Sequence, residues 1–306
     1  MPASEIDISV IVPANNAQKN LPRCLRALQA QSLRARAGME VIVVDGGSSD
    51  RTHEIALEFR QADPAFFRIH RQKGAGPSAA RSAGLSLARG KYVSFCDACS
   101  WAEPTMCETL YGACEESGAE IAGFGCENIW DQTLGGKLIR RDFLLSQGPY
   151  EDEEVLTARC LAHCVYYAAV ERPLWHPPAR PMQADFIRAG RLAAYDALRQ
   201  LIAEENLPLF CADWMGALRG ICLYEYRENA SSAAFYERMI TLAGEPQVME
   251  ALAHTERGTL CKAQRKFRDA FAARDWIKLE RRMRRESWRA KVRHVAGWMM
   301  YVCRGR

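Results

Sequence analysis

Residues 9–16 read SVIVPANN and residues 40–52 read EVIVVDGGSSDRT. Each stretch contains an unbroken run of apolar, mostly β-branched residues and then changes to small and polar ones. Strands that are buried on both faces of a parallel sheet have such continuous runs, whereas half-exposed strands alternate apolar and polar residues. We therefore predict buried strands over 8–12 and 41–44, each followed by a polar loop.

Strand and helix patterns alternate through the first 125 residues. Apolar residues recur at helical spacing in four segments, and short β-branched or aromatic runs separate these segments. This alternation predicts an α/β fold with a mostly parallel sheet and helices on both of its faces. The predicted helices cover about 21–28, 50–59, 77–89 and 104–114, and the further strands cover 67–69, 92–96 and 121–124.

Ligands of such sheets bind beyond the carboxyl ends of the strands, where the strand order reverses. The residues that follow the first, second and fourth predicted strands are 13–16, 45–50 and 97–100. A dinucleotide-dependent dehydrogenase needs a glycine-rich loop after its first strand, and residues 13–16 contain no glycine. The sequence therefore places the candidate site at these three loops and argues against that class of enzyme.

Two further stretches complete a recognisable pattern, GPSAARSAGLSLARGKYVSFCDA at 76–98 and WAEPTM at 101–106. In this order and spacing, the four stretches resemble family 2 glycosyltransferases of the GT-A fold. The resemblance covers about 8–125, with weaker similarity at 151–152 and 224–227. It implies a nucleotide-sugar-binding α/β half, and the sequence pattern beyond Gln183 predicts a mainly helical region after it.

The resemblance also implies roles for residues at the strand ends. Asp45 would hydrogen-bond the base of the donor, because a carboxylate suits an N–H group. Arg81 would face the diphosphate, where a permanent cation is useful. The alternatives are a turn or cap residue for Asp45 and a solvated helix face for Arg81. The nucleoside pocket would be walled by Pro13, Ala14, Asn15 and Asn16.

The loop after the fourth strand departs from the family pattern. The family has Asp-x-Asp there, and its last acid holds Mg²⁺ or Mn²⁺. Asp97 is present, but Cys99 stands at the second acidic position and Ser100 follows it. Hard divalent ions prefer oxygen ligands, so a thiol is a poor substitute. We expect Asp97 to hold a metal weakly or to bind the ribose, and its alternative role is that of a turn acid.

A family member that inverts the anomeric centre needs one carboxylate as general base. The resemblance assigns this role to Asp152, with Glu151 and Glu153 as close rivals. The alternative is that these acids only begin a helix, since negative charge is favourable at a helix N-terminus. With Cys99 in place of the acid, the chain would lose the contact of a bound metal with the diphosphate. Losing one such contact in the transition state costs about 10²–10³ in rate, so the protein could be a slow enzyme or an inactive one.

The C-terminal segment carries most of the positive charge. Residues 262–306 have a net charge of +11, whereas the rest of the chain is at −7 and the whole at +4. Aromatic residues recur among the arginines at helical spacing, which suits the anionic inner face of a membrane. The alternative is a helix packed on the protein or on a partner. No nucleic-acid recognition motif accompanies the charge, so we expect no nucleic-acid partner.

These features predict three regions: a donor-binding half over 1–125, an acceptor-side half over 126–230 and a basic helical extension over 231–306. No targeting signal precedes residue 8 and no run of 18 apolar residues occurs, so we expect a cytoplasmic location, peripheral at the membrane. The predicted function is transfer from a UDP-sugar to a glycan or lipid-linked acceptor in cell-envelope polysaccharide biosynthesis. The alternative is a catalytically inactive GT-A domain that binds nucleotide sugars or a protein partner.

Overall fold

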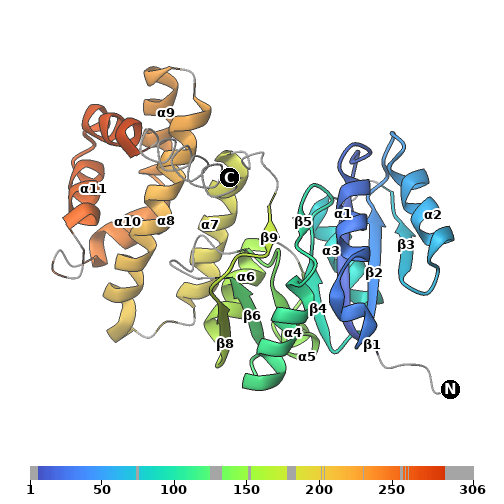
Figure 1. Ribbon diagram of the computed structural model, residues 1–306. Coiled ribbons are helices and arrows are strands. Elements are labelled where there is room, and N and C mark those ends of the chain that lie inside the picture. Colours follow the sequence, from blue (N-terminus) through green and yellow to red (C-terminus); the bar gives the residue numbers. More distant parts are fainter. Residues whose placement is uncertain are drawn as a thin grey trace, which may run out of the picture. The chain divides into compact units, whose positions relative to one another are not determined.

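The computed structural model describes residues 6–73, 76–124, 133–150, 153–177, 184–200, 202, 204–229, 231–255, 258, 260 and 262–286. The chain divides into two compact units, Met1–Pro181 and Met182–Arg306. Figure 1 shows the first unit in blue to yellow-green and the second in yellow to red. The boundaries expected at 125 and 230 stay predictions.

The first unit is built on one seven-stranded sheet, with strand order β3-β2-β1-β4-β7-β6-β8. All neighbouring strands are parallel except β7, which is antiparallel to both β4 and β6. The mostly parallel sheet confirms the predicted fold class. The strands are β1 (Ile6–Ala14), β2 (Gly38–Asp45), β3 (Phe67–Arg71), β4 (Tyr92–Phe95), β6 (Ile121–Phe124), β7 (Leu138–Arg140) and β8 (Tyr167–Val170).

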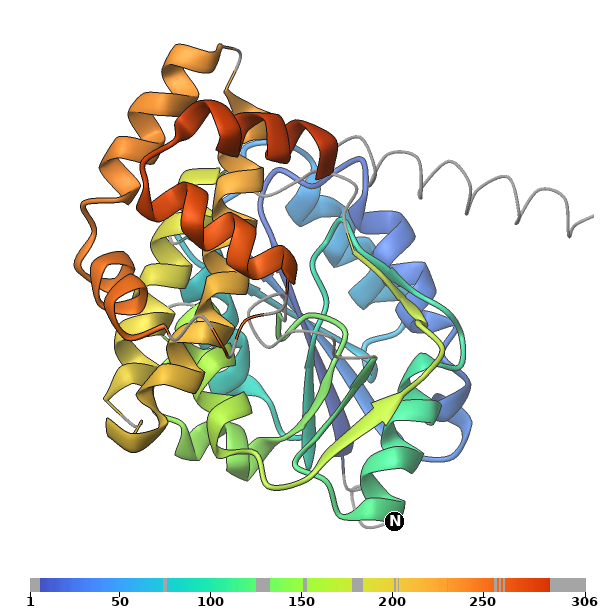
Figure 2. The ribbon, with the colours of Figure 1, turned by 90° about the vertical axis from the view of Figure 1, so that its left-hand side faces the viewer.

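Helices cover both faces of this sheet, as predicted. Val10 and Val12 of β1 pack into one hydrophobic cluster, whereas Ile11 between them packs into another. Successive side chains of a strand point to opposite faces, so the continuous apolar run serves both clusters. The first cluster contains α1 (Leu21–Gln29) and α4 (Met106–Ser117), with α2 (Thr52–Ala62). The second contains α3 (Pro77–Leu87), α5 (Arg141–Ser146) and α6 (Glu153–His163) (Figure 2).

Helix α3 lies very close to the centre of the sheet. A Cβ atom at Gly84 would lie 2.3 Å from Cγ2 of Ile11, so no larger residue fits there without a shift. A two-stranded antiparallel ribbon, β5 (Trp101–Ala102) with β9 (Trp175–His176), follows the end of β4. The close packing holds α3, which carries Arg81, and the ribbon holds the chain just after the loop that carries Asp97.

Every secondary-structure element in the described part of the second unit is a helix. A further helical stretch covers 276–286, and no described helix has the length and apolar character needed to span a membrane. The helices are α7 (Ala184–Arg199), α8 (Leu207–Glu228), α9 (Ser232–Leu242), α10 (Pro246–His254) and α11 (Lys262–Ala272).

The apolar face of the basic segment is packed inside this second unit. Phe267, Phe271, Leu279 and Met283 are at most 1% exposed. In the described part, 262–286, these four side chains are therefore not available to a bilayer, and the packed alternative fits them better. Residues 287–306 lie outside the described residues, so membrane contact stays a prediction.

Candidate donor-binding site

The carboxyl ends of three strands lie side by side. Ala14 of β1 is the register partner of Asp45 in β2, and Asp45 is the partner of Arg71 in β3. The backbone N–H of Gly46 donates to the oxygen of Ala14 at 2.9 Å, and that of Gln72 donates to the oxygen of Asp45 at 2.9 Å. The loops that leave these strands therefore start at one edge of the sheet.

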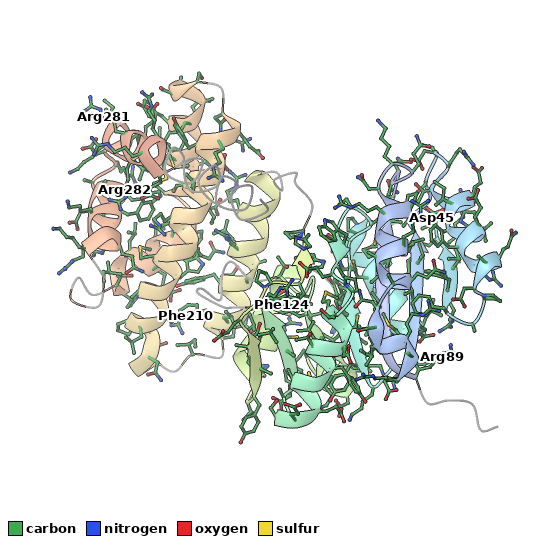
Figure 3. All side chains as sticks on the ribbon, viewed as in Figure 1. Asp45, Arg89, Phe124, Phe210, Arg281 and Arg282 are labelled. Carbon is green, nitrogen blue, oxygen red and sulfur yellow. The ribbon has the colours of Figure 1, made fainter. Side chains whose placement is uncertain are left out.

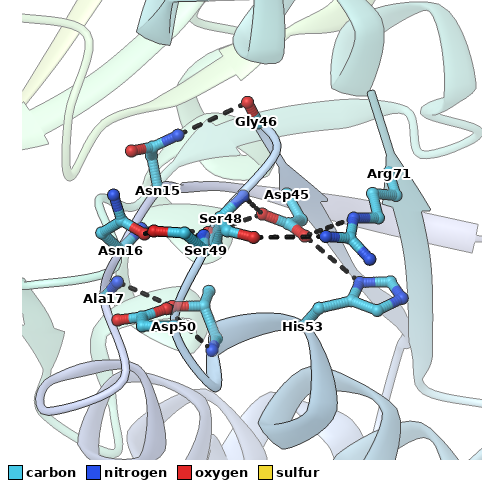
Figure 4. A network of polar contacts seen from close by, with 11 residues as sticks. Asn15, Asn16, Ala17, Asp45, Gly46, Ser48, Ser49, Asp50, His53 and Arg71 are labelled. Atoms are coloured by element: carbon cyan, nitrogen blue, oxygen red, sulfur yellow. Dashed lines mark hydrogen bonds and ion pairs between the residues drawn. The ribbon is translucent and has the colours of Figure 1, made fainter. Parts of the chain in front are cut away.

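Asn16 and Asp45, both predicted site residues, are joined through Ser48 (Figure 4). The backbone N–H of Asn16 donates to Oγ of Ser48 at 3.0 Å. Ser48 in turn donates to Oδ1 of Asp45 from its N–H at 2.9 Å and from its hydroxyl at 2.6 Å. Asn16 has a φ of +47°, a conformation that asparagine tolerates better than most residues. The structure thus brings the first two predicted loops into one polar network.

The Asp45 carboxylate is fully buried at the bottom of this network. Its Oδ2 lies 3.2 Å from Nε of Arg71 and 3.3 Å from Nδ1 of His53, and its side chain is 0% exposed. No described residue makes a well-aligned hydrogen bond to Oδ2, so the Arg71 contact is an ion pair without a well-aligned hydrogen bond. Sequence reasoning missed Arg71 and His53. Arg71 could have been found from the sequence, because it follows the third predicted strand in the way that Asp45 follows the second.

The other members of the predicted nucleoside wall differ in exposure. Pro13 and Ala14 are buried as the last residues of β1, whereas Asn15 is exposed. Nδ2 of Asn15 lies 3.4 Å from the oxygen of Gly46, a long contact. Only Asn15 and Asn16 of this wall therefore present side chains at the surface.

Arg81 and Asp97, from α3 and from the loop after β4, form the second part of the site. Nη2 of Arg81 donates to Oδ1 of Asp97 at 2.6 Å, and Nη1 lies 3.0 Å from Oε2 of Glu153 at the start of α6. Burial lowers the pKa of the Arg81 guanidinium, but Glu153 and Asp97 outweigh burial and raise it overall. Arg81 is therefore a permanently charged link between two acids.

The proposed base, Asp152, lies outside the described residues. Its rival Glu153 is described, is 15% exposed at its side chain and is paired with Arg81. A carboxylate held by a buried arginine is a weaker base than a free one. This pairing argues against Glu153 as the general base and makes it a structural partner of Arg81.

The side chains present do not fit a protein-built site for a hard divalent cation. Oδ1 of Asp97 is already held by Arg81, and Cys99 offers a thiol where the family has an acid. Among the described residues, no group of three or more His, Cys, Asp or Glu side chains is arranged to hold a metal ion. Mg²⁺ and Mn²⁺ need several oxygen ligands, so this donor set disagrees with the metal that the family pattern implies.

Sulfur and aromatic groups surround the Asp97 loop instead. Sγ of Cys24 lies 3.8 Å from Sγ of Cys96, and both face the backbone oxygen of Asp97. The rings of Trp101 and His176 stack with centroids 3.8 Å apart, and the Arg23 guanidinium lies 4.6 Å from the Trp101 ring. These contacts connect α1 and the β5–β9 ribbon to the loop and hold it in place.

Comparison with known proteins gives one family. The model of Glycosyl transferase family 2 matches residues 9–168, more than half of the 306-residue chain. The glycosyltransferase GlyA of Streptococcus pneumoniae is 40% identical over 115 residues, which cover 38% of this chain and 16% of GlyA. The uncharacterized glycosyltransferase EpsJ of Bacillus subtilis is 28% identical over 228 residues, 74% of this chain and 62% of EpsJ. The chain thus spans less than two thirds of either relative.

Solved structures share the fold at low sequence identity. Residues 1–349 of S. aureus TarS align with a TM-score of 0.68 at 14% identity, covering 94% of this chain and 92% of TarS. The same TarS segment is known in complex with UDP-GlcNAc. The mannosyltransferase PcManGT from Pyrobaculum calidifontis, in complex with GDP-Man and Mn²⁺, aligns at a TM-score of 0.52 and 17% identity, covering 91% of this chain and 87% of PcManGT.

Proposed function

Because the chain belongs to glycosyl transferase family 2, we propose that it transfers a sugar from a nucleoside diphosphate donor, a UDP-sugar, to a glycan or lipid-linked acceptor. The observation that carries the proposal is the network at the strand ends that joins Asn16 to Asp45 through Ser48. It lies within the segment matched by the family model, as does the Arg81–Asp97 pair. The proposed pathway is cell-surface polysaccharide synthesis.

The choice of a UDP-sugar is supported by a structural neighbour. TarS, which aligns over most of this chain, is known in complex with UDP-GlcNAc. In the proposed complex, Asn15 and Asn16 wall the nucleoside, and the diphosphate lies toward Arg81 and Asp97. The sugar then points toward the start of α6, where the acid-rich sequence 151–154 begins.

We propose a single-displacement reaction with inversion at the anomeric carbon. Asp152 takes the proton of the acceptor hydroxyl as the hydroxyl oxygen attacks that carbon. The bond from carbon to the phosphate oxygen breaks, and negative charge develops on the leaving diphosphate. Arg81 supports that charge from α3, because preorganised cations stabilise charge where it develops. A divalent cation, Mg²⁺ or Mn²⁺, would supply further positive charge there, but Asp97 and Cys99 do not fit such an ion, so no part of the proposed reaction depends on it.

A second candidate function is a binding module without catalysis. The observation that favours it is the donor set at Asp97 and Cys99, which does not fit a firm metal site. Such a module would bind a nucleotide sugar, or a protein partner, through the same strand ends. It would not turn the donor over.

The location proposed for the protein is cytoplasmic, with peripheral contact to anionic lipids through 262–306. What supports the contact is the net charge of +11 in this segment, since basic segments are attracted to anionic headgroups. Within 262–286 the apolar face is buried, so this part of the segment would contact lipids through its charge. Binding to anionic vesicles that disappears in high salt is the expected result.

Calorimetry and a turnover assay test the proposed function together. UDP should bind the wild-type protein, and a UDP-sugar should be hydrolysed or transferred at a rate that depends little on Mn²⁺. Binding of UDP without any turnover, with or without Mn²⁺, would support the binding module. If neither UDP nor any other common nucleoside diphosphate binds, both candidate functions are wrong.

A further inference from the structure

The carboxylate expected to contact the base is fully buried in this structure. Oδ1 of Asp45 already accepts two hydrogen bonds from Ser48, and Oδ2 faces Arg71 and His53. Its side chain is 0% exposed. Oδ2 makes no well-aligned hydrogen bond, but the side chain is fully buried, so the groups that face outward and can meet the base belong to neighbouring residues.

Arg71 lies at the same edge of the sheet and is open to a ligand. Its Nε lies 3.2 Å from Oδ2 of Asp45, and its Nη2 donates to the backbone oxygen of Ser48 at 3.2 Å. The side chain is nevertheless 51% exposed. Figure 4 shows the guanidinium beside the loop that carries Ser48, across from Asn15 and Asn16. Two contacts thus orient the guanidinium while part of its donor edge faces outward.

We propose that Arg71, held by Asp45 and Ser48, recognises the base of the donor nucleotide. This inference rests on the proposed function, because it needs a nucleoside diphosphate at these strand ends. A guanidinium donates hydrogen bonds and accepts none. It therefore pairs with a base edge that presents acceptors, such as the keto oxygens of uracil or O6 and N7 of guanine. Adenine presents an amino donor beside its N7, so it is disfavoured.

In this arrangement Asp45 acts through another residue. Its carboxylate contacts Nε of Arg71 and balances the positive charge of the guanidinium. Arg71 therefore keeps its orientation when no ligand is bound. Arginine suits this role better than lysine, because its planar fork is already arranged to make parallel hydrogen bonds. Asp45 is thus a positioning residue, and Arg71 determines specificity.

The simpler alternative is that Arg71 only compensates the charge of a buried acid. Arg89 serves as a control for this alternative, because it also pairs with a buried carboxylate of β2. Arg89 is 58% exposed and pairs with Glu40, another β2 carboxylate with 0% exposure. Figure 3 shows Asp45 and Arg89 well apart, toward opposite ends of the strands. Arg89→Ala therefore removes an exposed arginine from a buried β2 carboxylate far from the proposed base, and Glu40 keeps Arg68 as its second cation.

The experiment measures Kd by calorimetry for UDP, GDP and ADP, with Mg²⁺ present throughout. Wild type should prefer UDP or GDP over ADP. Arg71→Ala should weaken binding of the preferred nucleotide on the order of tenfold to a hundredfold while ADP changes little, so the preference disappears. Arg71→Lys keeps the charge beside Asp45 and should lose most of the preference as well. Arg89→Ala should leave the ratio of the Kd values unchanged.

Three results would overturn the inference. In the first, Arg71→Ala weakens all three nucleotides by one common factor, which means that Arg71 acts only as a charge. In the second, Arg71→Lys keeps the full preference, a test that holds even if the alanine variant fails to fold. In both cases UDP or GDP still binds wild type, so the proposed function survives. In the third, wild type binds no nucleotide, and the proposed function fails with the inference.

Discussion

The Arg81 guanidinium donates from Nη2 to Oδ1 of Asp97 over 2.6 Å, and this contact ties α3 to the loop after β4. Glu153 holds the other amino group of Arg81 at 3.0 Å. The side chain of Arg81 is 9% exposed, whereas that of Asp97 is 33% exposed. The pair therefore combines a buried cation with an acid that water still reaches.

Replacing Arg81 by methionine keeps most of the side-chain volume and removes the charge. Two acids, Asp97 and Glu153, then lose their shared cation. We expect the free energy of unfolding to fall by about 1–3 kcal/mol, less than for a fully buried pair because water reaches Asp97. Nucleotide binding should weaken as well. Urea denaturation followed by circular dichroism measures the first effect and calorimetry with UDP the second.

Arg36→Met is the matched control for that change. Arg36 pairs with Glu108 at 2.7 Å, but its side chain is 76% exposed. Exposed pairs contribute about 0–1 kcal/mol, so this variant should stay close to wild type. Equal losses of stability in both variants would show that the burial of Arg81 does not matter.

Replacing Cys99 by aspartate should restore the metal dependence that the family pattern implies. The new carboxylate adds an oxygen ligand two residues after Asp97. We expect Mn²⁺ to increase UDP affinity at least tenfold more in Cys99→Asp than in wild type, measured by calorimetry with Mn²⁺ or with EDTA. Cys99→Ser, which adds a neutral oxygen, is the control and should respond like wild type. An identical Mn²⁺ response in all three proteins would contradict the prediction.

Replacing Asp152 by asparagine tests the proposed base. The variant keeps the shape of the side chain and removes its ability to accept the acceptor proton. We expect kcat to fall by about 10²–10⁴, with the Kd for UDP unchanged, because the base acts on the acceptor. Asp142→Asn is the control, since Asp142 is 76% exposed on α5. A fall in kcat of less than threefold for Asp152→Asn would rule this residue out.

Glu40 gives a prediction about stability and its pH dependence. Its buried carboxylate accepts hydrogen bonds from Ser9, Arg68 and Arg89. Burial raises the pKa of Glu40, but these hydrogen bonds outweigh burial and bring it below the ordinary value of 4.5. Glu40→Gln should therefore lower the free energy of unfolding at neutral pH by about 2–4 kcal/mol.

The sign of the pH effect follows from the lowered pKa. The folded state binds the proton of Glu40 less readily than the unfolded state does, so the stabilisation is complete above the unfolded pKa. It is lost as the pH falls through the folded pKa. Urea denaturation of wild type and Glu40→Gln should thus differ most at neutral pH and converge in acid. A gap that widens in acid would contradict the assignment, and Glu116→Gln on the exposed face of α4 is the control.

Much of the first unit could be predicted from the sequence because its signals are local. The apolar runs at 8–12 and 41–44 indicate strands buried on both faces, and both runs lie inside the longer strands β1 and β2, which have 9 and 8 residues. Strand β7 was not predicted, because its three residues are too few to show the apolar pattern that identifies a strand. Its antiparallel pairing with β4 and β6 comes from tertiary structure alone.

The sequence by itself determined which loops meet, since parallel strands bring their carboxyl ends to one edge. It could not determine which side chains of those loops stay open. Asp45 was selected as a ligand, but the fold buries it under Ser48 and leaves Arg71 half exposed. Only tertiary structure pairs Arg81 with Asp97 and Glu153, residues from three separate elements. The physical reason is that residue type sets which interactions a side chain can make, whereas burial and neighbours decide which of them are already used.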